Sequence, residues 1–328
     1  GGGPMSGSKR PSAVSQVLVS EGEGSPYSLP YSKGLTASRM MVTGLSPFRS
    51  YQVAERIEER LHERGEPSIT ADELNEIAVE VLEDVAGERY AKNFLRYRKV
   101  EELDIPLVLL IGGATGVGKS TIATQLAARL GVVRVVATDA IREVMRGLFS
   151  RELMPTLYTS SFDADTALRE APLAAGDRIV VGFREQTAAV AVGLNALLER
   201  AAIEGTSLII EGAHAVPGFI DLEPWQDRVL AVQTVVTVED DDVHQSHFVA
   251  RGFDTAARPA DRYVESFSKI RKVQKYIKSQ ALSHGVPVIP NYNLDQSLAT
   301  IIDLVVERTA ERAAGLRAAE PSMEGKSA

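Results

Sequence analysis

The sequence predicts an α/β fold, a doubly wound and mostly parallel sheet, preceded by a small and mainly helical domain. From Pro106 onward, apolar runs of strand length alternate with longer segments of helical period, which is the pattern of βαβ units. Before that point helical patterns predominate, and a turn-rich passage over 21–34 interrupts them. A chain of 328 residues is long enough for two domains.

The composition sets the expected domain boundaries. The first and last segments, 1–15 and 318–328, are polar, and we expect a disordered tag or tail at each end. Between them we expect a small domain over 16–103 and a larger α/β domain over 104–317.

The elements of the small domain follow from helix-start signals. A short strand is expected over 16–20, and a helix at Ser46-Pro47, because serine is a good cap and proline suits the first turn. The apolar face of this helix is expected to hold Tyr51, Val53, Ala54, Ile57 and Leu61. Thr70 and Glu73 have the spacing of a capping box for the next helix. A third, short and basic helix is expected over 87–97.

The elements of the larger domain alternate. The continuous apolar run 107–111 is typical of a strand that is buried on both faces of a parallel sheet. Further strands are expected over 132–137, 207–210, 229–237 and 286–289. Helices are expected over 120–130, 140–149, 177–204 and 260–283.

The bulk composition excludes several classes of function. Apolar residues make up 44% of the chain and charged residues 24%, as in an ordinary globular protein. A net charge of −8 argues against a protein that coats nucleic acid. The chain has no cysteine, so disulfides, thiolate metal sites and cysteine nucleophiles are excluded, and no apolar run is long enough to span a membrane. We expect a cytoplasmic protein without nucleic-acid or membrane partners, and a homo-oligomer stays open.

The strongest motif is a phosphate-binding loop. Residues 113–120 fit G-x4-G-K-[ST], with an apolar strand before and a helical pattern after, which argues against a fortuitous glycine-rich turn. Main-chain amides and the helix N-terminus would receive the phosphates of ATP. Lys119 would bridge the β- and γ-phosphates, and Ser120 would hold Mg²⁺. The predicted nucleotide-binding residues are Gly113, Ala114, Thr115, Gly116, Val117, Gly118, Lys119, Ser120 and Thr121.

A carboxylate and an arginine follow the second expected strand. Because the carboxyl ends of neighbouring parallel strands meet in one crevice, Asp139 would stand near the γ-phosphate. There it would accept a proton from the substrate hydroxyl or contribute to the Mg²⁺ shell. Arg142, one turn further on, would face an anionic acceptor. The alternative is that Asp139 only caps the helix.

A second carboxylate, Glu211, follows the expected strand 207–210. A charge directly after a buried strand is costly unless a metal or a base pairs with it, which suggests an acid that positions Mg²⁺ or polarises the acceptor. Lys119, Asp139 and Glu211 are therefore the predicted catalytic residues. His214 is a candidate contact for substrate phosphate, with a bystander in a loop as the alternative.

Basic residues gather in 247–280 of this otherwise acidic chain. Part of that charge, including Lys272, is explained as the solvated face of a helix. Kinases need arginines that close over the transferring phosphate and exclude water. The predicted lid or acceptor-phosphate residues are Arg251, Arg258 and Arg262.

Five stretches of sequence resemble the 2-phosphoglycerate kinase family of P-loop enzymes known from archaea. They are IGGATGVGKSTIA (111–123), VVATDAIREVMR (135–146), ELMPTLYTSSFDA (152–164), LIIEGAHAVPGF (208–219) and RPADRYVESFSKIRKVQKYI (258–277). The resemblance covers nearly all of 106–310. It implies that ATP and 2-phosphoglycerate give ADP and 2,3-bisphosphoglycerate. Thr159, Ser160 and Ser161 would add hydroxyl contacts to the acceptor, and a polar turn that caps a helix is the alternative for these three residues.

The small domain resembles an ATP-cone, a regulatory nucleotide-binding domain. The resemblance lies in SLPYSKGL (28–35), TGLS (43–46) and AKNFLRYR (91–98). Such domains usually carry a basic pair before the first turn, where this chain has SEGEG (20–24). Regulation by a nucleotide, with Lys33 as its ligand, and a structural or dimerising role both stay open.

Two further functions stay open beside a kinase of 2-phosphoglycerate. One keeps the reaction and changes the acceptor to another small phosphorylated metabolite. The other is a regulatory protein that senses ATP without phosphorylating a metabolite.

Overall fold

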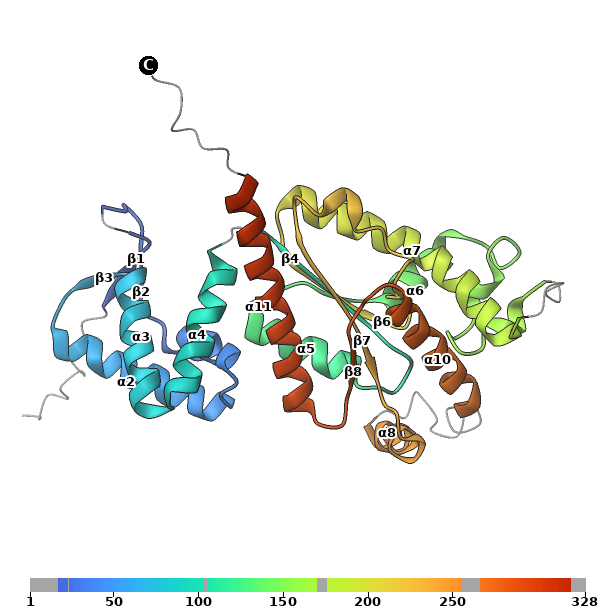
Figure 1. Ribbon diagram of the computed structural model, residues 1–328, viewed down its shortest axis with the longest axis horizontal. Coiled ribbons are helices and arrows are strands. Elements are labelled where there is room, and N and C mark those ends of the chain that lie inside the picture. Colours follow the sequence, from blue (N-terminus) through green and yellow to red (C-terminus); the bar gives the residue numbers. More distant parts are fainter. Residues whose placement is uncertain (1–16, 23, 103–104, 170–175, 255–265, 320–328) are drawn as a thin grey trace, which may run out of the picture. The chain divides into compact units, whose positions relative to one another are not determined.

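Strand β4 (Leu107–Gly112) lies at the centre of the larger sheet in the computed structural model (Figure 1). The structure describes residues 17–22, 24–102, 105–169, 176–254 and 266–319. All of β4 is buried, as its apolar run predicts. Its neighbours are β6 (Leu208–Gly212) and β7 (Leu230–Thr237), and both pair with it in parallel.

The strands of this sheet follow the order β5-β6-β4-β7-β8, with every pair parallel. The edge strands are β5 (Val135–Ala137) and β8 (Val288–Pro290). Because all strands point the same way, the carboxyl ends of β4, β5, β6 and β7 meet at one edge, where α/β proteins place their ligands. The predicted doubly wound, parallel sheet is confirmed.

Helices cover both faces of the sheet. Figure 1 shows α5 (Lys119–Leu130) and α11 (Leu294–Ala319) together on one side, and α7 (Arg178–Glu204) and α10 (Phe267–Ser283) on the other. The core between α7 and the sheet is formed by aliphatic side chains such as Leu110, Leu194 and Ile210. The remaining elements among the described residues of this unit are α6 (Thr138–Leu148), α8 (Asp241–Asp254) and three 3-10 turns, η2 (Pro155–Tyr158), η3 (Ala164–Ala167) and η4 (Glu223–Trp225).

Several boundaries differ from the prediction. The strand expected over 132–137 begins only at Val135, because Val133 is 96% exposed and gains nothing from the sheet. The helix expected over 260–283 is described from Phe267 onward, and its earlier residues lie outside the described part of the chain. The expected tail from 318 begins inside α11, and its residues after 319 lie outside the described part, as do residues 1–15.

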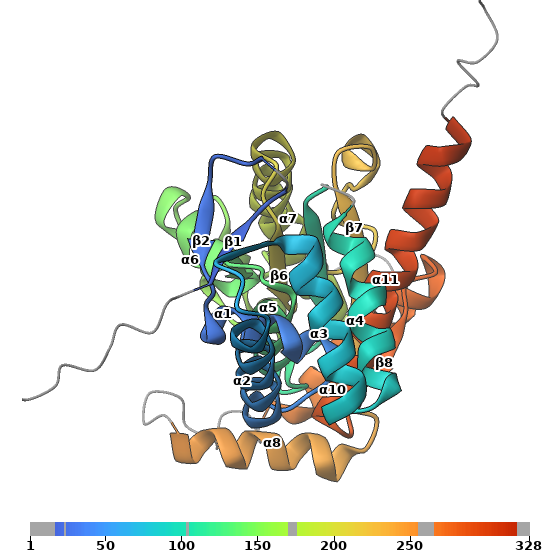
Figure 2. The same ribbon diagram turned by 90° about the vertical axis from the view of Figure 1, so that its left-hand side faces the viewer.

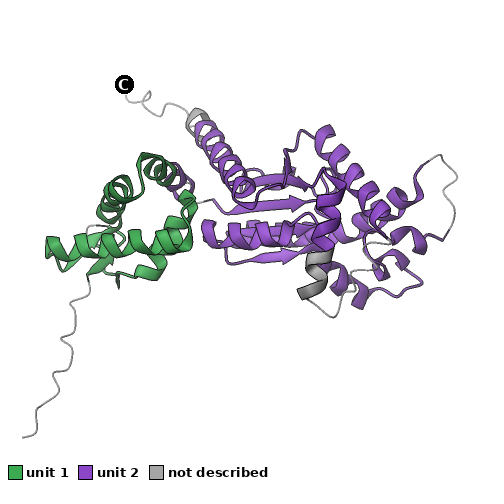
Figure 3. Ribbon diagram, turned by 90° about the horizontal axis from the view of Figure 1, so that it is seen from below, with its two compact units in different colours: residues 1–95 green, residues 96–328 purple. Residues whose placement is uncertain are grey.

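The chain divides into two compact units, residues 1–95 and 96–328 (Figure 3). The division falls inside α4 (Glu88–Glu101), which is longer than the short helix expected over 87–97. The domain boundary expected at 103–104 lies outside the described residues. None of the described helices combines the length and the apolar character that a membrane span requires.

The first unit is mainly helical, with a small three-stranded sheet. Figure 2 shows its hairpin of β1 (Leu18–Ser20) and β2 (Ser28–Pro30); β3 (Ser68–Thr70) pairs with β1 in parallel. Its other elements are α1 (Lys33–Met40), η1 (Met41–Thr43), α2 (Pro47–Arg64) and α3 (Ala71–Val85).

Both predicted helix starts in this unit are confirmed. Ser46 caps α2 by accepting a hydrogen bond from the amide of Arg49, and Thr70 and Glu73 form the capping box of α3. The expected apolar face of α2 is wrong at one position. Tyr51 is 49% exposed, and Ser50 is buried in its place, because the helix turns this neighbouring position toward the core.

Candidate active site

The predicted phosphate loop connects the buried strand β4 to helix α5. Its backbone has positive φ at Gly116 (86°) and Gly118 (92°), a region that side chains with a Cβ rarely adopt. Lys119 is only 8% exposed, and its Nζ donates a 2.7 Å hydrogen bond to the carbonyl of Ala114 within the loop. The loop therefore carries one buried ammonium group at the carboxyl end of the central strand.

Ser120 and Glu211 meet beside this loop. The Ser120 hydroxyl donates a 2.9 Å hydrogen bond to Glu211 Oε1. Glu211 is held here because it pairs with Ile111 in the register of β6 on β4, one position before both strands end. The Glu211 side chain is largely buried, at 7% exposure for the residue. Ser120, the predicted Mg²⁺ ligand, and Glu211, a predicted catalytic acid, thus lie together.

The chemistry of this pair fits Mg²⁺. A hydroxyl and a carboxylate are both oxygen donors, and Mg²⁺ takes one or two such protein ligands, together with water and substrate phosphates. Within the described residues there is no group of three or more His, Asp or Glu side chains that would form an all-protein metal cage. An ion held by this hydroxyl and carboxylate would take its remaining ligands from water and the nucleotide phosphates.

Asp139 and Arg142 lie on the first turns of α6, at the carboxyl end of β5. Asp139 does not cap this helix, because the N-cap position belongs to Ala137, and the Asp139 side chain is 64% exposed. The Arg142 side chain is 14% exposed, and its Nε lies 3.7 Å from the Asp139 carboxylate. Arg142 Nη1 also donates to the carbonyl of Thr159, so the structure brings these three predicted residues together.

The hydroxyls of Thr159 and Ser160 have partners inside the protein. Thr159 donates to the carbonyl of Thr156 at 2.9 Å, and Ser160 donates to Asp163 at 2.9 Å. Asp163 also lies 3.4 Å from the ammonium group of Lys269 on α10. Thr159 and Ser160 therefore belong to a turn that is held by internal hydrogen bonds and contacted by side chains of α6 and α10.

His214 lies in a buried hydrogen-bond relay. It is fully buried; its Nδ1 lies 3.0 Å from the Thr138 hydroxyl, and its Nε2 lies 2.8 Å from Gln186 Oε1. Gln186 in turn donates to the carbonyls of Thr156 and Thr159, at 2.5 and 3.0 Å. Because burial disfavours its charged form, with Arg142 and Lys119 adding repulsion against attraction by Asp139, the pKa of His214 falls from 6.5 to about 4. Both ring nitrogens are occupied, so in this structure the imidazole supports its neighbours.

Gln186 and Thr138 were not predicted. Gln186 is an ordinary polar residue in a helical pattern, and Thr138 lies between an expected strand and an expected helix. No local signal distinguishes either residue. A group that reaches the phosphate loop from the C-terminal half of the sequence was not predicted either. It consists of His244, His247 and Phe248 on α8 and Asn291 after β8. The spacing of the three α8 residues, which places them on one helix face, was the available signal.

The basic stretch over 247–280 is described only in part. Arg258 and Arg262 lie outside the described residues, and Arg251 lies on α8 with its side chain outside them. Lys272, expected on a solvated face, is half exposed and pairs with Asp177 at 2.8 Å. Arg271 is instead engaged inward, with the carbonyl of Val238 among its acceptors.

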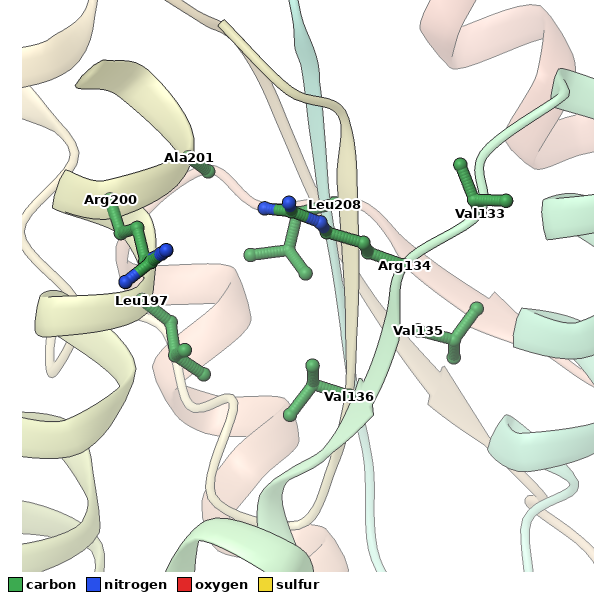
Figure 4. Close-up of a pocket in the computed structure, with 8 residues that line it drawn as sticks. All are labelled: Val133, Arg134, Val135, Val136, Leu197, Arg200, Ala201 and Leu208. Atoms are coloured by element: carbon green, nitrogen blue, oxygen red, sulfur yellow. The ribbon is translucent and has the colours of Figure 1, made fainter. Parts of the chain in front are cut away.

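A cavity of about 230 Å³ lies elsewhere, at the opposite end of the sheet (Figure 4). It is lined by Val133, Arg134, Val135, Val136, Leu197, Arg200, Ala201 and Leu208. Residues 133–136 and Leu208 lie around the start of β5 and β6, and the other three lie on α7, whereas the phosphate loop follows the end of β4. Arg134 and Arg200 are both paired with Glu204, at 2.8 and 2.6 Å. This cavity is separate from the candidate active site.

In the first unit, Lys33 pairs with two carboxylates. Its Nζ lies 2.8 Å from Glu58 and 3.6 Å from Glu55. The side-chain hydrogen bond to Glu58 raises the pKa of Lys33. Nucleotide binding by this unit, which resembles an ATP-cone, stays a prediction.

A phosphate loop after the central strand, a buried lysine and a Ser–Glu oxygen pair define the class of this protein: it is a P-loop small-molecule phosphotransferase. Comparison with known proteins narrows the class. The 2-phosphoglycerate kinase of Methanothermobacter thermautotrophicus is 40% identical over 298 residues, which cover 90% of this chain and 97% of the relative. The 2-phosphoglycerate kinase of Methanopyrus kandleri is 38% identical and covers 85% of this chain and 84% of the relative. The chain belongs to the 2-phosphoglycerate kinase family, as its sequence motifs predict.

Two other comparisons add little. No family model matches the sequence. The solved structure of shikimate kinase from Bacteroides thetaiotaomicron is 18% identical, with a TM-score of 0.32 over 63% of this chain and 98% of that one. A likeness of this size carries no conclusion about this chain.

Proposed function

We propose that this protein transfers the γ-phosphoryl group of ATP to the free hydroxyl of 2-phosphoglycerate, which gives 2,3-bisphosphoglycerate and ADP. The observation that carries the phosphoryl-transfer chemistry is the contact between Ser120 and Glu211 directly beside the phosphate loop. The choice of acceptor is supported by the similarity to 2-phosphoglycerate kinases over nearly the whole chain.

The residues around the loop suit binding of a triphosphate. Main-chain amides of 113–120, at the N-terminus of α5, would donate to the phosphate oxygens. Lys119 would exchange its contact with the Ala114 carbonyl for the β- and γ-phosphates. Ser120 would ligate Mg²⁺, with Glu211 holding the hydroxyl or the ion's water; the ion would supply charge neutralisation between the phosphates. Thr121, exposed on the first turn of α5, would contact the α-phosphate.

The acceptor would lie between the loop and α6. In-line transfer requires the acceptor hydroxyl to be positioned and its proton to be accepted, and the exposed carboxylate of Asp139 is available for both. Arg142, Thr159 and Ser160 would contact the phosphate and carboxylate of the acceptor. His214 would act through Thr138 and Gln186, by fixing the turn that carries Thr159. We assign Arg251, Arg258 and Arg262 to closure over the transferring group.

A coupled ADP-release assay with a panel of phosphorylated hydroxy acids tests this function. Turnover that depends on the acceptor supports a kinase, and the acceptor with the highest kcat/KM identifies its substrate. If 2-phosphoglycerate is inactive and another phosphorylated metabolite is turned over, the acceptor is wrong and the reaction class stands. Tight ATP binding without turnover of any acceptor would favour an ATP sensor.

A further inference from the structure

Three consecutive carbonyls of the phosphate loop are held by side chains from distant parts of the chain. His244 Nε2 lies 2.8 Å from the carbonyl oxygen of Thr115, and His247 Nδ1 lies 2.8 Å from that of Gly116. Asn291 Nδ2 donates to the carbonyl of Val117 at 3.0 Å. A carbonyl can only accept, so each imidazole nitrogen must carry the hydrogen.

The geometry of the peptide bond connects these contacts to phosphate binding. In a trans peptide, the carbonyl oxygen and the amide hydrogen of the next residue point in opposite directions. Holding the carbonyls of 115, 116 and 117 toward α8 and Asn291 therefore aims the next three amides away from these side chains. Those amides belong to Gly116, Val117 and Gly118, which are among the donors that a phosphate loop offers to its nucleotide.

The anchoring side chains are themselves fixed. Arg271 Nη1 lies 3.2 Å from His244 Nδ1, and its guanidinium also donates to the carbonyls of Val238 and Glu239, at 2.5 and 2.8 Å. Because a guanidinium only donates, His244 Nδ1 must accept, and the hydrogen of the neutral ring lies on Nε2. Burial, with repulsion from Arg271, His247 and Lys119, lowers the pKa of His244 to about 4, so the ring is neutral at pH 7.

Asn291 is fixed by a comparable set of bonds. Its Oδ1 accepts a 2.9 Å hydrogen bond from Ser297, which orients the amide so that Nδ2 faces Val117. Its main-chain amide donates to the carbonyl of Thr237 at the end of β7, at 2.8 Å. The side chain is thus attached to the sheet as well as to α11.

The loop also packs directly on its anchors. A Cβ at Gly116 would overlap the ring of Phe248, and a Cβ at Gly118 would lie 2.6 Å from Asn291 Nδ2. The middle glycines of the motif therefore allow both a positive φ and this close approach. The anchors and the loop form one packed unit.

We propose that His244, His247 and Asn291 are positioning residues for phosphoryl transfer, which hold three loop carbonyls outward so that the following amides are preorganised for the nucleotide phosphates. Amides that are already aimed cost no reorganisation when the charge arrives. The inference rests on the proposed function only in that the loop binds a nucleotide.

Matched variants separate the hydrogen bond from the volume of the side chain. His244→Gln and His247→Asn keep an amide nitrogen near the position of the donating ring nitrogen, whereas His244→Leu and His247→Leu remove the donor. Each leucine variant leaves one loop carbonyl without its donor, so we expect it to bind ADP and ATP about tenfold more weakly by titration calorimetry. The amide variants keep a donor to the carbonyl, so their affinities for ADP and ATP should stay within about threefold of the parent's. The KM for the acceptor should not change, and His62→Leu in the first unit is the control.

The outcomes distinguish this inference from the proposed function. If the parent and the leucine variants bind ADP equally well, the proposed role of His244 and His247 is overturned. The kinase assignment is unaffected by that result. Equal losses in the leucine and amide variants would show that packing, not the hydrogen bond, matters, and would also overturn the proposed role.

A measurement on the unmodified protein covers the case in which a variant fails to fold. Imidazole nitrogen NMR at pH 7 should show a neutral His244 ring with its hydrogen on Nε2, and a hydrogen on Nδ1 of His247. The opposite tautomer at either ring, or averaging between tautomers, would overturn the proposal without any variant.

Discussion

The hydroxyl of Ser120 lies 2.9 Å from a carboxylate oxygen of Glu211, although 91 residues separate them in sequence. The contact exists because β6 pairs with β4 in a register in which both strands end together. The phosphate loop follows the end of β4, and Glu211 is the last residue but one of β6. Under the proposed function, this contact would place two oxygen ligands suited to Mg²⁺ beside the phosphates of the nucleotide.

Glu211→Gln keeps the shape of this contact and removes its charge. We expect kcat to fall by about 100-fold, the size of loss seen when one preorganised electrostatic group is removed, and the Mg²⁺ concentration for half-maximal rate to rise. Steady-state rates over a Mg²⁺ titration measure both. The double variant Ser120→Ala/Glu211→Gln should lose less transition-state stabilisation than the sum of the losses in the two single variants, because both residues serve one site. An unchanged Mg²⁺ dependence in Glu211→Gln would remove Glu211 from the metal site.

Lys119→Ala removes the buried ammonium group of the loop. We expect turnover to fall by at least about 100-fold, because no other described side chain supplies a cation within the loop to the developing charge. The coupled assay measures the rate, and Lys92→Ala, an exposed lysine of α4, is the control. Retention of a rate near that of the parent would contradict the role of Lys119.

Arg142→Gln tests the acceptor side of the site. We expect the KM for the acceptor to rise about tenfold or more and the KM for ATP to change little, because a charge-assisted contact to an anion is lost while the loop is untouched. Arg146→Gln, one turn further along α6 and 47% exposed, is the matched control. If the ATP affinity falls with that of the acceptor, Arg142 serves the nucleotide instead.

Two buried histidines predict how stability depends on pH. Burial lowers the pKa of both His214 and His244 from 6.5 to about 4, so between these values the unfolded chain binds more protons than the folded one. Their contribution to the free energy of unfolding is complete above about pH 6.5 and is lost as the pH falls toward 4. Each fully titrating histidine contributes a slope of about 1.4 kcal/mol per pH unit.

Urea unfolding at pH 7, 6 and 5 measures this dependence. The variant His244→Gln should show a shallower decline than the parent, because it removes one of the two groups. Equal declines in the two proteins would mean that His244 does not titrate with a lowered pKa.

Local sequence predicted the parts of this molecule that local chemistry determines. The strand at 107–111 is predicted by its unbroken run of apolar residues, and the loop at 113–120 by the spacing of its glycines. The capping box at Thr70 is predicted by the glutamate three residues later. Strand pairing then brings Ser120 and Glu211 together, as expected when parallel strands end at one edge.

The rest depends on contacts across the fold. Nothing near Gln186 in sequence shows that its amide meets His214 and the turn at Thr159, because α7 must first pack on the sheet. The contact of His247 with Gly116 spans 131 residues, and no expected helix covered 241–254. The loss of Val133 from the edge strand has a similar cause, since only the finished sheet shows which side chains it leaves exposed.

Phosphorus NMR of the reaction with ATP, Mg²⁺ and 2-phosphoglycerate tests the proposed function most directly. We expect two new phosphate-ester signals of equal intensity, for the 2- and 3-positions of 2,3-bisphosphoglycerate, to grow as ATP is converted to ADP. Conversion of ATP to ADP and inorganic phosphate alone, with the signal of 2-phosphoglycerate unchanged, would contradict it.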